Sequence, residues 1–421
     1  MTAGMPRQVV TVGTGVAILG LTSFGYLAVV GRVLGPADVV PLTTLWVLIN
    51  AIGPALFFPL EQEVGRAVAA RQAVGLGARP VLVRAATLGF ALVLVLAAVC
   101  AAAGAPLSRW LFDGEFLVLA SFFVGGVGLC AQHLTRGAFA GTGNFLRYGV
   151  QLGADGVLRL AGAVALALAA STQVGWYAVL LGLSPILAVV LTAPRPGRLL
   201  ADGPPASWQD VGSALGLLIA GSVFAQFVVN AAPIAANVLA TTDERARVGV
   251  FISALVLVRI PLFVFAAVQA ALLPGLARLA AVDDRAAYRR RLRSILLLVS
   301  GLGLAGLLVV AAAGPWLVQL VYGEQFRSTR ADLIPLALAT AAYMLALVLS
   351  QALISLRSYR ASLAGWGVAS LAFVVALIVP AELELRVGGA FLTGAAVGAI
   401  WLAVAMAVRL RQPLVSPARA A

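Results

Sequence analysis

The sequence predicts an all-α integral membrane protein, with about twelve transmembrane helices arranged in two six-helix bundles. Hydrophobic residues make up 62% of the 421 residues, and the mean hydropathy is +1.03. Only 11% of the residues are charged, whereas about a quarter of a typical soluble domain is charged. Apolar runs of about 20 residues, the length that crosses a bilayer, recur along the chain. These observations exclude a water-soluble protein.

Each apolar run between hydrophilic gaps is a predicted span. The loops that follow the second and eighth spans are similar in length, and the longest external gap is 314–331. No gap is long enough to fold as an extramembrane domain. The predicted spans are residues 9–30, 39–60, 81–103, 115–135, 149–170, 174–193, 211–238, 248–274, 295–313, 332–353, 362–380 and 387–408.

The charge distribution predicts the orientation in the membrane. The formal net charge is +13, and the basic residues are all arginines, found mostly in the gaps that are cytoplasmic if the N-terminus is cytoplasmic. This asymmetry is typical of cytoplasmic loops and not of a nucleic-acid-binding face. We therefore expect a multi-pass plasma-membrane protein with both termini in the cytoplasm and no nucleic-acid partner. The arginines of 285–293 are expected to contact anionic lipid head groups.

The sequence offers no pattern for catalysis, metal binding or a cofactor. Cys100 and Cys130 both lie inside predicted spans, where a disulfide or metal site is not expected. No phosphate-binding loop, nucleophile motif or acidic pair lies on an external segment. The first apolar run lacks a small-residue cleavage site and is interpreted as a retained span. We therefore expect neither an enzyme nor a signal peptide.

The two halves of the chain resemble each other. We interpret residues 194–210, which are rich in proline, as a cytoplasmic linker between lobes 1–193 and 211–421. Segments 105–116 and 314–326 share the spacing from a proline to a Gly–Glu pair. Six spans is an even number, so the halves begin on the same side and form a parallel repeat with a pseudo-twofold axis along the membrane normal. Such a repeat usually places a substrate cavity between its halves.

Arg259 is the most unusual residue, because it lies near the middle of the eighth predicted span. A charge at that depth costs several kcal/mol unless it faces a partner or a wet cavity. Pro261 cannot donate a backbone hydrogen bond and should loosen the surrounding turn. The sequence predicts one membrane-spanning helix in which Arg259 has a functional role.

Polar residues form stripes along two other spans. In the seventh span, Gln226, Asn230 and Asn237 lie on one helical face, and in the second span Asn50 shares a face with Trp46. Such stripes either hold helices together or line a cavity. Both interpretations remain open for the amides.

Asp155 and Arg159 are four residues apart in the fifth predicted span. This spacing allows an internal ion pair, and a substrate-binding role for Arg159 is the alternative. If the two residues pair, Arg259 is left over, since Asp155 is the only acid that the predicted boundaries place well inside a span. An interior with one excess positive charge favours an anionic substrate such as a phosphate or pyrophosphate.

Two further residues are candidates for proton coupling. His133 is the only histidine and lies near the end of the fourth predicted span, where it is either structural or part of a proton relay. Glu61 lies where the second predicted span ends, and it is either a solvated helix-end residue or a coupling group.

Three passages resemble the polysaccharide or oligosaccharide flippases of the Wzx kind, within the superfamily that includes multidrug exporters and the lipid II flippase. They are YLAVVGRVLGPADV (26–39), RGAFAGTGNFLRYGVQLGADGVLRL (136–160) and the segment 249–281, which contains the Arg-Ile-Pro sequence. The resemblance implies alternating access between two lobes and a diphosphate held by cationic residues. At the matching positions the candidates are Arg259, Arg159 and, at an external gate, Arg32. The lipid II flippase has two extra spans and a charged first span, so that substrate fits less well.

We therefore expect a secondary transporter that moves a polyprenyl-diphosphate-linked oligosaccharide from the cytoplasmic to the outer leaflet for cell-surface polysaccharide synthesis. Glycosyltransferases or a polymerase of that pathway are the expected partners. A multidrug or small-molecule exporter of the same superfamily is the first alternative. A non-transporting scaffold of a cell-envelope synthase is the second.

Overall fold

The structure is a computed structural model that describes residues 4–193, 201–206, 208–241, 245–322, 324 and 326–414. The chain divides into two compact units, Met1–Gly216 and Leu217–Ala421, here called the N-terminal unit and the C-terminal unit. The division falls inside one helix, α9 (Trp208–Leu239). The interpretation of 194–210 as a linker falls partly outside the described residues. Within it, Asp202 forms an ion pair of 2.9 Å with Arg79 of the N-terminal unit.

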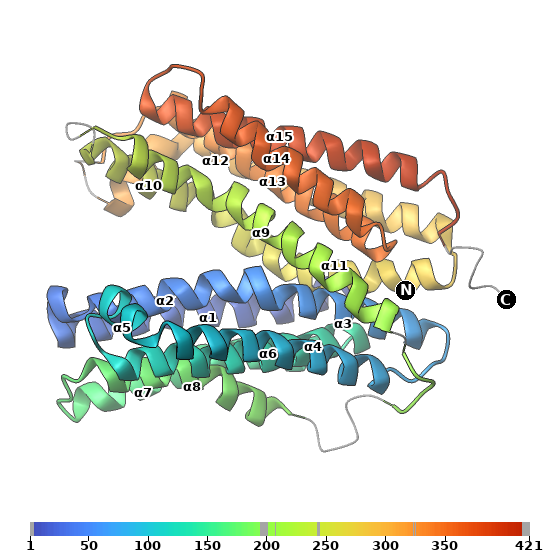
Figure 1. Cartoon of the computed structure of the whole chain (residues 1–421). Coiled ribbons are helices and arrows are strands. Elements are labelled where there is room, and N and C mark those ends of the chain that lie inside the picture. The colour runs from blue at the N-terminus through green and yellow to red at the C-terminus, as the bar shows by residue number, and fades with distance from the viewer. Residues whose placement is uncertain are drawn as a thin grey trace. The chain divides into compact units, whose positions relative to one another are not determined.

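Helices account for nearly all the regular structure of the described residues (Figure 1). The N-terminal unit contains α1 (Gly4–Asp38), α2 (Val40–Ile52), the π-helix η1 (Gly53–Phe57), α3 (Phe58–Ala73), α4 (Arg79–Ala102), α5 (Gly104–Leu111), α6 (Phe116–Thr142), α7 (Phe145–Leu168) and α8 (Val174–Thr192). The C-terminal unit contains most of α9, then α10 (Arg245–Val258), α11 (Ile260–Ala281), α12 (Arg285–Tyr322), α13 (Arg330–Ser355), α14 (Tyr359–Ala376) and α15 (Leu383–Arg409).

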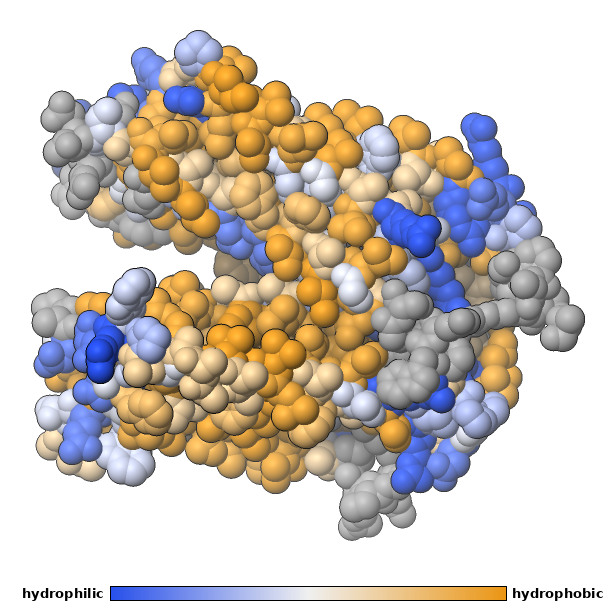
Figure 2. Space-filling view, viewed as in Figure 1, coloured by the Kyte–Doolittle hydropathy of each residue, from blue (hydrophilic) through white to orange (hydrophobic). Residues whose placement is uncertain are grey.

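The predicted fold class is confirmed. Among the described residues, 12 helical segments are long and apolar enough to cross a membrane. Large apolar side chains such as Phe90, Val190 and Leu371 are more than 60% exposed, which is expected where lipid replaces water as the solvent. Figure 2 shows apolar residues along the helices and hydrophilic residues gathered at the helix ends. The chain is a multi-pass membrane protein.

Several predicted boundaries were wrong, because helices continue past the apolar runs. The helix of the second span continues as α3 to Ala73, and that of the eighth continues as α11 to Ala281. The predicted gap at 314–331 is also too long, since α12 extends to Tyr322. Charged side chains in these extensions are paired or half-buried, so local hydropathy underestimates the length of the helices.

The two segments that suggested a repeat have different structures. Residues 104–111 form the separate helix α5, whereas the matching stretch beginning at Gly314 continues α12 through Pro315. Gly323, the second glycine of the motif, lies outside the described residues.

A stronger likeness between the units lies in the turns that end α6 and α13. Gly143 (φ +80°) and Arg357 (φ +58°) both adopt the left-handed conformation. In each turn the N–H of the following residue donates a hydrogen bond to the carbonyl five residues earlier. The two bonds run from Asn144 to Phe139 and from Ser358 to Leu353. The same geometry also ends α3, α7 and α11. The order of the spans, fourth and fifth against tenth and eleventh, therefore relates α6 and α7 to α13 and α14.

Glycines allow close helix packing inside the N-terminal unit. A Cβ added at Gly137 on α6 would lie 2.7 Å from the carbonyl oxygen of Glu61 on α3, and one at Gly141 would meet Val68 at 2.6 Å. A small residue every fourth position lets two backbones approach in this way. As a result, side chains of α3 and α6 face each other at short range.

Two spans contain an irregular turn. In the second, η1 joins α2 and α3, and the N–H of Phe58 bonds to the carbonyl of Gly53, five residues earlier. In the eighth, α10 ends at Val258 and α11 begins at Ile260, so Arg259 lies at a break. The prediction of a single span is confirmed, because Arg247–Ala281 is one candidate span, but the helix is interrupted at Arg259. Pro261 in the first turn of α11 explains the interruption, since it lacks a backbone donor.

Candidate functional site

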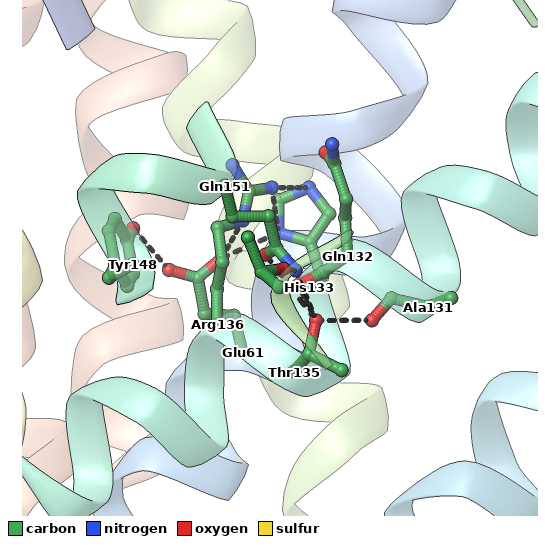
Figure 3. Close-up of polar contacts among 9 residues, drawn as sticks. Glu61, Ala131, Gln132, His133, Thr135, Arg136, Tyr148 and Gln151 are labelled. Carbon is green, nitrogen blue, oxygen red and sulfur yellow. Dashed lines mark hydrogen bonds and ion pairs between the residues drawn. The ribbon is translucent and has the colours of Figure 1, made fainter. Parts of the chain in front are cut away.

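The N-terminal unit contains a buried polar cluster formed by Glu61 of α3, His133 and Arg136 of α6, and Tyr148 of α7 (Figure 3). The Nδ1 atom of His133 lies 2.7 Å from Oε2 of Glu61, and the Tyr148 hydroxyl donates to Oε1 at 2.6 Å. The Nε atom of Arg136 lies 3.4 Å from the same Oε2 atom. One carboxylate therefore joins three other side chains from two further elements.

The position of Glu61 corrects the interpretation of this residue as a solvated helix end. Glu61 is 6% exposed and His133 is 6% exposed. The helix does not end at residue 60, because η1 leads directly into α3. The structure thus brings together two residues that the sequence suggested separately for proton coupling.

Asp155 and Arg159 form the ion pair that their spacing allows, with 3.0 Å between Oδ1 and Nη2. Both side chains are buried on α7, and Nε of Arg159 donates to the Ser184 hydroxyl of α8 at 3.3 Å. Arg159 therefore has a carboxylate and a hydroxyl as partners.

Asp155 is not the only acid inside a span. Glu61 and Glu63 are also buried in α3, and Glu63 pairs with Arg66 one turn later. In the N-terminal unit these acids are matched by arginines, namely Arg66, Arg136 and Arg159. These pairs do not involve Arg259, which belongs to the C-terminal unit.

Arg259 is half-buried at the break between α10 and α11. Its Nη2 atom donates to the carbonyl of Val229 on α9, and its guanidinium lies 5.7 Å from the centre of the Phe391 ring. Its Nε atom is buried with no hydrogen-bond partner. Among the described residues, no carboxylate lies within ion-pair distance of this guanidinium. A buried donor without a partner is costly, and it leaves the residue able to bind an anion.

The amides of α9 lie beside the carbonyl that Arg259 contacts. The side chain of Asn230 is exposed and donates to the Gln226 side-chain oxygen at 3.1 Å. The same amide nitrogen also donates to the main-chain carbonyl of Gln226 at 3.0 Å, so its hydrogen bonds are made within α9. The side chain of Asn237 lies outside the part of the chain that the structure describes.

The last two candidates, Asn50 and Arg32, are exposed in the N-terminal unit. Asn50 donates to the carbonyl of Trp46 at 2.8 Å on its own helix. Arg32 lies on α1, one turn before the kink at Gly35. The structure does not join either residue to the buried cluster.

Sequence reasoning missed Arg136 and Tyr148. The signal was available in part, because His133 and Arg136 are three residues apart on one helix and so share a face. Contact with Tyr148 depends on tertiary packing and could not be read from spacing. Among the described residues, no group of three or more metal-binding side chains occurs, and Cys130 is buried without a disulfide.

Comparison with solved structures identifies the fold. A mutant of the Vibrio cholerae MATE transporter VcmN superimposes with a TM-score of 0.81 and 17% identity, covering 97% of this chain and 96% of that one. A multidrug resistance MATE family transporter of the MOP superfamily, in an outward-facing conformation, gives a TM-score of 0.79 and 16% identity, with coverage of 97% and 96%. The chain therefore has the fold of the MATE transporters.

Comparison of sequences identifies relatives in mycobacteria. No protein-family model matches the chain. A protein of Mycobacterium tuberculosis strain H37Rv, Rv1510, is 32% identical over 330 residues, which cover 75% of this chain and 72% of that protein. The Mycobacterium bovis protein Mb3654 is 29% identical over 296 residues, with coverage of 68% and 65%. The chain belongs to the same family as mycobacterial Rv1510.

Proposed function

We propose that the protein is a secondary transporter that moves a polyprenyl-diphosphate-linked oligosaccharide across the membrane by alternating access. The MATE-like fold supports a transporter, and the absence of an acidic partner for Arg259 among the described residues supports an anionic substrate. Arg259 combines a helix break, a buried free donor and an unmatched positive charge. This single residue carries the substrate proposal.

Arginine suits a diphosphate because its guanidinium presents donors in a planar fork. One edge of the Arg259 guanidinium is occupied by the carbonyl of Val229, and its face lies over Phe391. These contacts hold the side chain, while Nε and the charge remain for the ligand. Gln226 and Asn230 would contact sugar hydroxyls through the Gln226 amide nitrogen and the Asn230 side-chain oxygen.

A multidrug exporter is the second candidate, favoured by the multidrug transporters that share the fold. Arg259 would repel a cationic drug at short range. The charge of the preferred substrate therefore separates the two proposals.

The test is a flipping assay with the purified protein in liposomes and a fluorescent polyprenyl-diphosphate sugar as the probe. We expect the wild type to move the probe, Arg259→Ala to lose most of the activity, and Arg259→Lys to retain part of it. Arg327 is an exposed arginine of the same unit, and Arg327→Ala is the matched control.

Normal flipping by both Arg259 variants would show that this residue does not bind the diphosphate. Transport of ethidium by liposomes that do not flip the probe would favour the exporter. Folding of each variant is checked by size-exclusion chromatography in detergent before reconstitution.

A further inference from the structure

The cluster around Glu61 contains more ionisable side chains than helix packing requires. Glu61, His133 and Tyr148 can each gain or lose a proton, and Arg136 carries a fixed charge. All are buried in the N-terminal unit. Removing such groups from water costs several kcal/mol per ion, even when they are paired. A buried set of this composition therefore calls for a role beyond holding helices together.

In the C-terminal unit, the contact that corresponds to Arg136 and Tyr148 is made by neutral groups. Counting from the matched turns at Gly143 and Arg357, Arg136 corresponds to Ser350 and Tyr148 corresponds to Ser362. The hydroxyls of Ser350 and Ser362 hydrogen-bond at 2.7 Å. The contact between these two helices is thus made by small neutral groups in the C-terminal unit and by an arginine and a tyrosine in the N-terminal unit.

The contacts with Glu61 favour one tautomer of a neutral His133 when the Glu61 carboxylate is ionised. Glu61 accepts from Tyr148 and from Nδ1 of His133, so a neutral imidazole carries its hydrogen on Nδ1. The Nη2 atom of Arg136 lies 3.2 Å from both ring nitrogens of His133. The positively charged guanidinium therefore lies next to the atoms on which protonation of the imidazole would place a positive charge.

The described elements packed against this contact carry few other charged groups, one of which is the half-buried Arg84 of α4. On α3 the nearby Glu63 is engaged by Arg66. Gly53 of η1 lies beside Nε2 of His133, and Phe58 packs edge-on against the ring at 6.3 Å. Helices α4 and α8 meet α6 at Gly89 against Cys130 and at Pro185 against Gly128, contacts without charged groups.

We propose that Glu61 and His133 form a proton-binding site, in which a bound proton and the guanidinium of Arg136 exclude each other. The proton comes from water and adds to Nε2 of His133, while the Nδ1 hydrogen remains donated to Glu61. The charge of the cluster rises by one, and repulsion drives the Arg136 guanidinium away from the ring. The use of this site to couple proton movement to transport rests on the proposed function, but proton binding itself does not.

The single histidine makes the site directly observable. Because His133 is the only histidine in the chain, ¹⁵N-histidine labelling of the whole protein, purified with an affinity tag that lacks histidine, gives one imidazole in the NMR spectrum. In the wild type at about pH 6, near the middle of the range in which histidine usually titrates, we expect a neutral ring with hydrogen on Nδ1. A hydrogen on Nε2 instead would overturn the proposal without any variant.

Variants test the exclusion by Arg136. Removing a like charge this close should change the proton affinity at least about tenfold, so Arg136→Gln should show a clearly larger imidazolium fraction at the same pH. Arg109→Gln removes an exposed arginine of the same unit and should leave the spectrum unchanged. The proposal would be contradicted by an equal imidazolium fraction in wild type and Arg136→Gln. It would also be contradicted if Arg109→Gln raised that fraction as much as Arg136→Gln does.

A second measurement tests coupling. In liposomes that flip the diphosphate probe, an imposed pH gradient should change the initial rate for wild type, and Glu61→Gln should lose that dependence. A wild-type rate that is insensitive to the gradient would refute the coupling role. The NMR result requires no transport, so failure of the proton site and failure of the flippase proposal remain distinguishable.

Discussion

His133 and Glu61, separated by 72 positions in the sequence, meet at 2.7 Å between Nδ1 and Oε2. The contact depends on two glycines of α6, because Gly137 and Gly141 let the α3 backbone approach closely enough for Glu61 to reach the α6 face. The buried cluster is therefore a product of helix packing as much as of its polar residues.

Gly137→Ala should lower the stability of the protein. The added methyl group would lie 2.7 Å from the carbonyl oxygen of Glu61 and 2.9 Å from Cβ of Val64, so the backbones must separate. Overpacking of this kind costs about 1–3 kcal/mol. We expect a lower midpoint of thermal unfolding, measured by intrinsic fluorescence in detergent. Gly20→Ala is the control, because no atom lies within 4 Å of its added Cβ; equal midpoints for both variants would contradict the packing argument.

Asp155→Asn should lower the stability of the protein more than replacement of both residues of the ion pair. Both side chains are buried, and Nη2 of Arg159 lies 3.0 Å from Oδ1 of Asp155. Removal of the acid therefore leaves the charge of Arg159 uncompensated. Breaking a buried pair from one side costs about 3–5 kcal/mol, whereas replacing both partners with neutral groups is often nearly neutral. The double variant Asp155→Asn with Arg159→Met should therefore unfold at a higher temperature than Asp155→Asn alone. The opposite order would show that Arg159 is stabilised mainly by other groups, such as Ser184.

Arg247→Gln should lower the stability of the protein slightly, by an amount that depends on the salt concentration. Arg247 on α10 contacts Glu384 at 2.7 Å and Glu382 at 3.3 Å, and its side chain is 51% exposed. Exposed pairs contribute about 0–1 kcal/mol and are screened by ions. The difference in thermal midpoint from wild type should shrink at high salt. Arg327→Gln, at an exposed arginine of the same unit, is the control; a difference for Arg247→Gln that is independent of salt would rule out an electrostatic cause.

The sequence predicted the helical class and the number of spans, because apolar runs depend on composition. It did not predict where the second span ends. The segment after residue 60 has a low mean hydropathy, and Glu61, Glu63 and Arg66 read as solvated when considered separately. Their burial depends on mutual pairing and on contact with α6. A hydropathy average counts each charge as exposed and cannot detect such pairing.

The functional role of Arg259 stays a prediction, but the sequence did indicate an unusual position in the helix. The isolated charge and Pro261 indicated a special position, and Arg259 does lie at an irregular turn. The pattern could not show that the helix breaks there, since proline within a transmembrane helix is often tolerated with only a kink. The contact with Val229, thirty positions earlier, depends on packing between α9 and the break.

The π-helix η1 has a consequence for aligning this chain with its relatives. Its widened turn accommodates one residue more than an α-helix would, which rotates everything downstream by about 100°. Deletion of any single position in Gly53–Phe57 would restore regular α geometry, and Glu61 would then point away from His133. A one-residue gap in this stretch of an alignment would therefore distinguish homologues in which the carboxylate faces the imidazole from those in which it cannot.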